Sequence, residues 1–134
     1  MAEHPNVGRV REAYAAFARA DLDTALKDLA DDCVFHFGGH GPNSGDHQGR
    51  EAIEQALINN YTLTSGTQTL DIRGIFADDQ HATVMLHETA SRPDGATLAI
   101  DEVHVLSIDD YGKITNLWDI PADATVHDQF FDGE

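Results

Sequence analysis

Three ionisable residues in the later part of the chain have the types and spacing needed for proton transfer. Glu102 and His104 are separated by one residue, and Asp119 follows in the next strand-like segment. A carboxylate beside an imidazole in an apolar cavity suits acid–base catalysis, because desolvation and a close charge bring proton affinities toward neutral pH. We expect Asp119 to be the general base, with His104 and Glu102 as its catalytic partners.

The reaction expected of this trio is removal of a proton from a carbon next to a carbonyl group. Asp119 would take the proton, while His104 and Tyr14 would stabilise the enolate by hydrogen bonding. Isomerisation, elimination and aldol closure can all follow from an enolate, so the reaction type stays open. No cofactor is required, and the expected substrate is a small, mostly apolar carbonyl compound.

A structural role for the same residues is the alternative. Buried Glu and His pairs in small domains are often satisfied hydrogen-bond networks. The second hypothesis is therefore a non-catalytic module that binds a small ligand or forms dimers, and a filled or closed pocket is expected for it. A cavity in front of Asp119 would favour the enzyme.

Metal binding is a further option that the histidines raise. One possible ligand group surrounds a glycine-rich segment and comprises His36, His40 and His47, whose spacing matches no zinc signature. The other comprises His87, Glu102 and His104, a combination that suits zinc or iron. The second group is the more plausible of the two, but the acid–base interpretation is preferred to both, so no metal is expected. The remaining histidines are expected at the solvated surface: His4, His81 and His127.

Helices are expected in the first half of the chain. Residues 6–20 place apolar side chains three and four apart, the pattern of one helical face. Asp23 can cap a second, shorter helix that ends at residues 31–32, and a third helix is expected from Gly49 to about Tyr61. Between them lie a short β-type run and a segment, residues 38–45, that can only be a loop or lid, since it holds four glycines and a proline.

Strands are expected in the second half, where apolar and polar residues alternate. Four such runs, at 67–77, 82–91, 97–107 and 113–120, predict an antiparallel meander. Helices followed by strands indicate an α+β fold, with a curved antiparallel sheet wrapped around about three N-terminal helices. The length of 134 residues fits a single domain over residues 1–134.

Turn sequences predict the register of this sheet. A two-residue turn at Asp94-Gly95 places His87 opposite Glu102 and Met85 opposite His104. Four-residue loops at 78–81 and 109–112 extend the pairing to the outer strands. The face then expected to line a pocket carries Leu70, Ile72, Phe76, Met85, His87, Ile100, Glu102, His104, Leu106, Leu117 and Asp119.

Substrate-binding residues are drawn from this face, the first helix and the short β-type run. They are Tyr14, Phe17, His36, Phe76, Met85, His87 and Leu117. The opposite face is too apolar to be left in water, so we expect it to pack against a second copy of the chain as a homodimer. That face carries Ile75, Val84, Leu86, Val103, Val105, Ile114, Trp118 and Ile120.

Five segments resemble the SnoaL-like branch of the nuclear transport factor 2-like superfamily: residues 14–17, 20–26, 29–36, 49–53 and 112–119. The resemblance implies a cone-shaped α+β barrel, usually dimeric, with a pocket between sheet and helices and a polyketide- or steroid-like substrate. It also implies that Asp119 corresponds to the general base of SnoaL-like cyclases, and that Glu102 and His104 correspond to the family's polar pair. Glu102 departs from the neutral amide expected in a cyclase.

The same residues bear on other activities that this fold supports. Epoxide hydrolases use two carboxylates bridged by an arginine, and the expected pocket strands hold none near Asp119. Dehydratases use histidines and an acid with tyrosines, and this route stays open. Because the fold also hosts isomerases and binding modules, the resemblance does not fix the reaction.

The charge of the chain limits its partners and location. The 24 acidic and 8 basic residues give a net charge of −16, which repels nucleic acid and anionic membranes. No apolar run approaches the roughly 20 residues that cross a bilayer, and the start lacks the pattern of a signal peptide. Since the single Cys33 cannot form an internal disulfide, a cytoplasmic location is expected.

Overall fold

The computed structural model describes residues 3–38 and 44–131. Its central element is a curved, mixed sheet. Its six strands have the order β2-β1-β6-β5-β4-β3, so the sheet is open, with β2 and β3 at its edges. The strands are β1 (Leu29–Phe37), β2 (Gly45–Gln48), β3 (Thr69–Ala77), β4 (His81–Ser91), β5 (Thr97–Ile108) and β6 (Ile114–Pro121). The predicted antiparallel meander of the four later strands, β3 to β6, is confirmed. β1 also pairs antiparallel with β2, and the one parallel pair is β1 with β6.

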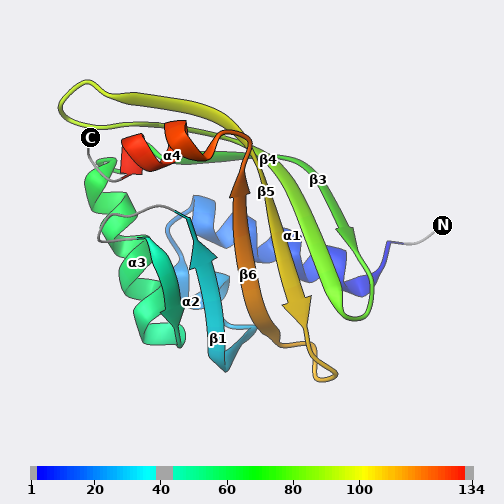
Figure 1. The fold of residues 1–134 in the computed structure, drawn as a ribbon. Coiled ribbons are helices and arrows are strands. Elements are labelled where there is room, and N and C mark those ends of the chain that lie inside the picture. Colours follow the sequence, from blue (N-terminus) through cyan, green and yellow to red (C-terminus); the bar gives the residue numbers. More distant parts are fainter. Residues whose placement is uncertain (1–2, 39–43, 132–134) are drawn as a thin grey trace.

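Four helices accompany the sheet: α1 (Pro5–Ala18), α2 (Leu22–Ala25), α3 (Arg50–Leu63) and α4 (Ala124–Phe131). Figure 1 shows the sheet curling over α1, with α3 beside β1 and α4 near the curled end of β4 and β5. The α+β prediction and its three N-terminal helices are confirmed. No helix among the described residues is long and apolar enough to cross a membrane.

The second helix is shorter than predicted, and its cap is a different residue. The side chain of Asp21, and not that of Asp23, accepts a hydrogen bond from the backbone N–H of Thr24 at 3.2 Å. The chain then enters β1 at Leu29. Alternate side chains of this segment, such as Cys33 and Phe35, are buried in the core, a period that suits a strand better than a helix.

The turn between β4 and β5 changes which side chains of β4 face inward. Arg92 and Ala96 are joined by a backbone hydrogen bond of 2.9 Å, so the turn holds residues 93–95, with Gly95 at φ 94°. A three-residue turn with a left-handed glycine shifts the pairing by one residue from that of a two-residue turn. Leu86 therefore lies opposite Glu102.

This shift exchanges the two faces of β4 and corrects several predictions. Met85 is 47% exposed and faces outward together with His87, whereas Val84 and Leu86 are buried in the core. Phe76 does pair with Thr83 as predicted, but it is 60% exposed because Thr83 itself faces outward.

The other residues predicted on the inner face do lie there, because irregularities in the strand pairing leave their side chains on that side of the sheet. A bulge in β3 between Ile72 and Gly74 retains Ile72 against the core, opposite Leu86 instead of His87. In β6 the pairing differs by two residues from the prediction, so Asp119 lies opposite His104. A shift of two leaves each side chain on its predicted face.

The outer face of the sheet is less apolar than predicted. Val84, Leu86 and Ile114 belong to the core, and Ile75 packs against it. The large apolar side chains that remain exposed on this face are Phe76, Met85, Trp118 and Ile120. The ring of His36 stacks on Trp118 with centroids 4.9 Å apart, so His36 also lies outside.

Candidate active site

A pocket lies between the inner face of the sheet and the helices. Its cavity volume is about 120 Å³, and it opens to solvent. Apolar and aromatic side chains form most of its wall, among them Phe17, Phe37, Leu117 and Phe131. Its polar lining includes six ionisable side chains, Tyr14, Glu88, Glu102, His104, Asp119 and His127, together with Ser44, Asn60 and Gln68.

His104 is the centre of the polar part of the pocket. Its Nδ1 lies 2.5 Å from the hydroxyl oxygen of Tyr14 on α1. Its Nε2 lies 3.3 Å from Glu102 Oε2 and 3.3 Å from Asp119 Oδ1. Burial would lower the pKa of His104, but Tyr14 and the two carboxylates outweigh burial and raise it well above its usual value. At neutral pH the ring is therefore an imidazolium.

The protonation of His104 fixes the direction of its hydrogen bonds. In an imidazolium both ring nitrogens are donors, so Nδ1–H donates to the Tyr14 oxygen and Nε2–H donates to Glu102. Burial raises the pKa of Tyr14, so its hydroxyl keeps its proton at neutral pH. That proton is then free to donate into the pocket.

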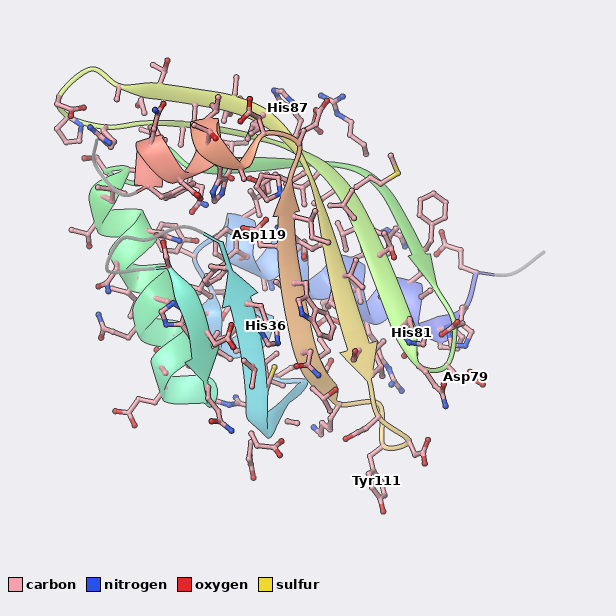
Figure 2. The ribbon with its side chains drawn as sticks, in the orientation of Figure 1. His36, Asp79, His81, His87, Tyr111 and Asp119 are labelled. Carbon is pink, nitrogen blue, oxygen red and sulfur yellow. The ribbon has the colours of Figure 1, made fainter. Side chains whose placement is uncertain are left out.

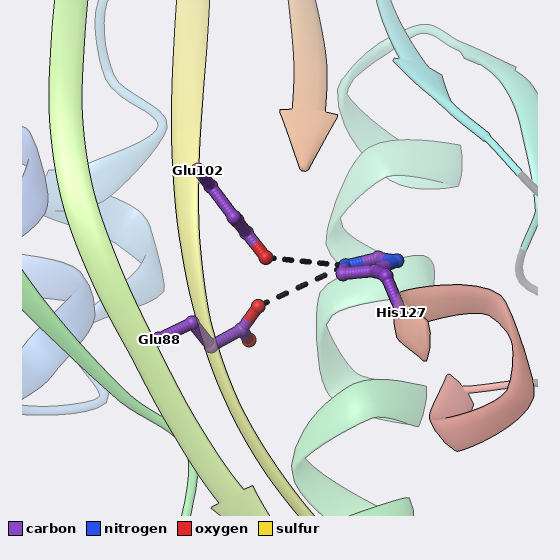
Figure 3. A group of neighbouring side chains, drawn as sticks. All are labelled: Glu88, Glu102 and His127. Atoms are coloured by element: carbon purple, nitrogen blue, oxygen red, sulfur yellow. Dashed lines mark ion pairs between the residues drawn. The ribbon is translucent and has the colours of Figure 1, made fainter. Parts of the chain in front are cut away.

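Helix α4 brings a second histidine to the same place. His127 Nε2 lies 3.3 Å from Glu102 Oε1 and 3.8 Å from Glu88 Oε1 (Figure 3). It also lies 3.7 Å from Asp119 Oδ2. Burial lowers the pKa of His127, but Glu102 and Asp119 raise it more. The prediction that His127 is a surface residue is wrong, because α4 folds back over the pocket. The spacing of residues 127, 130 and 131 along one helical face is the signal that sequence reasoning missed.

Glu88 is the other residue that sequence reasoning missed. It is 2% exposed, and its Oε2 accepts a hydrogen bond from Gln68 Nε2 at 2.5 Å. Burial and the neighbouring Glu102 raise the pKa of Glu88 to about 10, so it is a neutral acid at pH 7. The two-residue turn expected at residues 94–95 had placed this side chain on the outer face.

Glu102 carries the negative charge of this carboxyl pair. Burial alone would raise its pKa, but hydrogen bonds from His104, His127 and Glu88 lower it below its usual value. Glu102 is 4% exposed. It therefore links the two histidines through one buried carboxylate.

The predicted site residues divide into two groups. Those that line the pocket are Tyr14, Phe17, Glu102, His104, Leu117 and Asp119. Those that lie on the outer face, away from the pocket, are His36, Phe76, Met85 and His87, and the prediction that they bind substrate is wrong. His87 pairs with Asp101 at 2.8 Å outside the sheet, and Figure 2 shows its side chain well away from Asp119.

The metal group of His87, Glu102 and His104 considered from the sequence does not form, because His87 faces away from the other two. The other group includes His40, which lies outside the described residues. Two other groups do place ligand-type atoms within 4.8 Å of one another: Glu88, Glu102 and His127, and Glu102, His104 and Asp119. A metal would have to displace the ring protons that these carboxylates stabilise on the histidines.

The architecture defines the chain as a protein of the nuclear transport factor 2-like, or cystatin-like, fold. It is similar to the structure of Bal32a from a soil-derived mobile gene cassette, with 27% identity, a TM-score of 0.87, and 94% of this chain and 95% of that chain covered. A protein of unknown function from Xanthomonas campestris with a cystatin-like fold has 23% identity and a TM-score of 0.86, over 96% and 98% of the two chains. TerC, co-crystallised with polyporic acid, has 22% identity and a TM-score of 0.83, also over 96% and 98%.

The sequence places the chain more narrowly within this fold. The family model described as SnoaL-like domain matches residues 10–117, and the chain belongs to this family. The matched segment includes β1 to β5, which carry Glu88, Glu102 and His104, and the first half of β6. No curated protein matches the chain in the corresponding search.

Proposed function

We propose that this SnoaL-like protein is an acid–base enzyme that needs no cofactor and removes a proton next to a carbonyl group in a small, mostly apolar substrate. An isomerase, a cyclase or a dehydratase would each begin with this step. The observation that carries the proposal is the buried contact of Tyr14, His104 and Asp119 at the wall of a largely apolar, open pocket. A module that only forms dimers would have no use for such a cavity.

Asp119 is the base in this mechanism. Its side chain lines the pocket, and its Oδ1 has no hydrogen-bond partner among the described residues, so the carboxylate keeps the capacity to accept a proton from a bound substrate. The oxygen lies 3.3 Å from Nε2 of His104, whose own hydrogen bond goes to Glu102. The proton taken by Asp119 can return to another carbon of the substrate, which completes an isomerisation.

Tyr14 and His104 act on the oxygen of the substrate. The Tyr14 hydroxyl donates to the carbonyl oxygen, while the His104 imidazolium donates to the Tyr14 oxygen from behind. Hydrogen bonds that strengthen as the enolate charge develops lower the barrier, since they act in a pocket of low polarity. Glu102 holds His104 in the protonated form and in position.

The cavity limits the part of the substrate that enters it. A volume of about 120 Å³ is close to the roughly 150 Å³ of engineered cavities that bind benzene. A single ring therefore fits the apolar section, and the rest of a larger polyketide- or steroid-like compound would extend through the open mouth.

Isotope exchange tests the proposal without the natural substrate. A panel of single-ring ketones and β-diketones in D₂O is followed by proton NMR with and without the protein. We expect the wild type to accelerate exchange of the protons next to the carbonyl, and Asp119→Asn to lower that rate by about 10² to 10⁴. The matched control is Asp101→Asn, an exposed acid on the outer face of β5. No acceleration by the wild type, or unchanged exchange in Asp119→Asn, would refute the assignment.

We also propose that the outer face of the sheet joins two copies of the chain. Phe76, Met85 and Ile120 are 60%, 47% and 51% exposed on this face, an apolar surface that a second copy would cover. A symmetric pair would bring the same side chains together from both copies.

The proposed surroundings of the protein follow from its charge and its cysteine. The net charge of −16 disfavours nucleic acid and anionic membranes as partners. Cys33 is buried and free, and a lone cysteine without a disulfide suits a reducing, cytoplasmic location.

A further inference from the structure

Three neighbouring strands of the sheet each contribute one carboxyl side chain to the polar end of the pocket. Glu88 lies on β4, Glu102 on β5 and Asp119 on β6, and all three line the pocket. Among the described residues that line it there is no lysine or arginine, so the two histidines are the side chains that can carry a positive charge there. The charge of the three acids therefore has to be balanced by His104 and His127.

His127 is the histidine that forms contacts with all three acids. Its Nε2 lies 3.3 Å from Glu102, 3.7 Å from Asp119 and 3.8 Å from Glu88. Figure 3 shows Glu88 and Glu102 pointing toward its ring from two strands. His104 forms ion pairs with Glu102 and Asp119 from the opposite partner of the group, its own strand β5. One imidazole from α4 thus serves acids from three different strands.

Contacts of α4 hold the ring of His127 in this position. Phe130 packs against apolar side chains of β4 and β5, and its backbone carbonyl accepts a hydrogen bond of 2.6 Å from Nη1 of Arg92. The ring of Phe131 lies against that of His127, with centroids 4.6 Å apart. The other ring nitrogen, Nδ1, lies 3.8 Å from Oδ1 of Asp128. The imidazole is therefore fixed from both sides.

At neutral pH the charges of this group balance. Burial and Glu102 raise the pKa of Glu88 to about 10, so this acid keeps its proton and has no charge. The carboxylates of Glu102 and Asp119 then supply the negative charges, and His104 and His127, whose pKa values are raised, supply as many positive charges. A buried group of ions is favoured when its charges are paired in this way.

Loss of one positive charge would leave an excess negative charge that a proton has to neutralise. Glu88 cannot take this proton, because it already carries one. Glu102 accepts a hydrogen bond from Nε2 of His104, and such a bond stabilises the charged form of a carboxylate. Oδ1 of Asp119 has no hydrogen-bond partner among the described residues, so the excess proton would go to Asp119. A protonated Asp119 cannot act as a base.

We propose that His127 is a positioning residue, whose positive charge keeps the general base Asp119 ionised. It acts through Asp119 and not on the reacting atoms. His104 cannot supply this charge alone, because its imidazolium is shared by Glu102 and, through Tyr14, by the developing enolate. The inference rests on the proposed function and adds the residue that sets the pH range in which the base works.

The pH dependence of ketone proton exchange tests this role. The rate is measured in D₂O from about pH 4 to 9 for the wild type and for His127→Gln, which keeps a hydrogen-bond donor but not the charge. We expect the pH at which the rate falls to half on the acid side to rise by about one to three units in His127→Gln, the usual effect of losing an opposite charge at this distance. The matched control His81→Gln, at an exposed position, should keep the wild-type profile.

Nuclear magnetic resonance gives two readouts that do not depend on turnover. Carbon NMR of labelled aspartate carboxyl groups follows Asp119, whose signal is identified by its absence from Asp119→Asn. This signal should titrate at a higher pH in His127→Gln than in the wild type. Nitrogen NMR of the wild type should show the ring of His127 as an imidazolium at neutral pH. The last measurement needs no variant, so it decides even if His127→Gln does not fold.

The outcomes separate the role of His127 from the proposed reaction. An equal fall in rate at every pH, or an unchanged titration of Asp119 in His127→Gln, would overturn the inference and leave the reaction intact. A neutral His127 ring in the wild type at neutral pH would overturn it as well. If the wild type does not accelerate exchange but the Asp119 signal shifts in His127→Gln, the electrostatic role of His127 stands and the catalytic proposal fails.

Discussion

The hydroxyl oxygen of Tyr14 lies 2.5 Å from Nδ1 of His104, although 90 residues separate them in the chain. The contact joins the first helix to the inner face of β5. A side chain from the amphipathic stripe of α1 thus reaches the centre of the pocket instead of only filling the core. Because Nδ1 of the imidazolium carries a proton, the tyrosine oxygen accepts and its own proton is directed elsewhere.

Removal of the Tyr14 hydroxyl is expected to slow proton exchange. In Tyr14→Phe the developing enolate loses its donor, so the exchange rate of bound ketones should fall about 100-fold. Proton NMR in D₂O measures this rate. Tyr111→Phe is the control, since Tyr111 is 89% exposed at the turn before β6 (Figure 2). Equal rates for Tyr14→Phe and the wild type would remove Tyr14 from the mechanism.

His127 is expected to be important for stability as well as for the site. Its replacement by Ala leaves Glu102 and Asp119 with less compensating charge, and breaking a buried ion pair costs about 3 kcal/mol. Urea unfolding followed by circular dichroism measures the loss in the free energy of unfolding. His81→Ala, at an exposed position, should change it little. A His127→Ala protein as stable as the wild type would show that this contact contributes little.

Stability is expected to fall as pH rises from about 5 to 9. His104 and His127 have raised pKa values in the folded protein, so their stabilising contribution is complete below the unfolded value near 6.5 and is lost as pH rises through the folded values. Glu88, raised from 4.5 to about 10, acts in the same direction, since the folded protein holds a proton that the unfolded chain releases.

The variant Glu88→Gln isolates one of these groups. It should flatten the dependence of the free energy of unfolding on pH by up to about 1.4 kcal/mol per pH unit between pH 6 and 9. Urea unfolding at several pH values measures both slopes. The general repulsion among acidic residues is common to the two proteins and cancels in the comparison. Parallel slopes would mean that Glu88 is ionised in the folded protein.

Trp118→Glu tests the proposed homodimer. Trp118 is 37% exposed on the outer face, and a charge there would have to be buried between two copies. We expect the wild type to have the mass of a dimer by light scattering and Trp118→Glu to have that of a monomer. Tyr111→Glu, on the loop, should remain dimeric. A dimeric Trp118→Glu protein would place the contact on another surface.

The sequence was sufficient for the fold class because its signals are periodic and local. Apolar residues three and four apart in residues 6–20 predicted α1, and alternation in the second half predicted β3 to β6. Glu102, His104 and Asp119 share the inner face because β5 and β6 differ from the predicted pairing by an even number of residues. An error of two residues leaves each side chain on its predicted face of the sheet, although the residue opposite it on the neighbouring strand is a different one.

The incorrect parts have specific physical causes. Residues Asp94-Gly95 allow a two-residue turn, but the chain includes Pro93 in the turn as well, and the odd shift moved Met85 and His87 outward. It also brought Glu88 inward. His127 could not be placed from the strands at all, since its position depends on the path of α4 after the sheet ends.

Helix α4 is part of the core and part of the pocket wall at the same time. Phe130 packs against Ala90, Leu98 and Ile100 of β4 and β5, while His127 and Phe131 line the pocket. Two turns of helix thus couple the packing of the curled end of the sheet to the shape of the pocket, so a substitution in residues 124–131 bears on stability and on the pocket together.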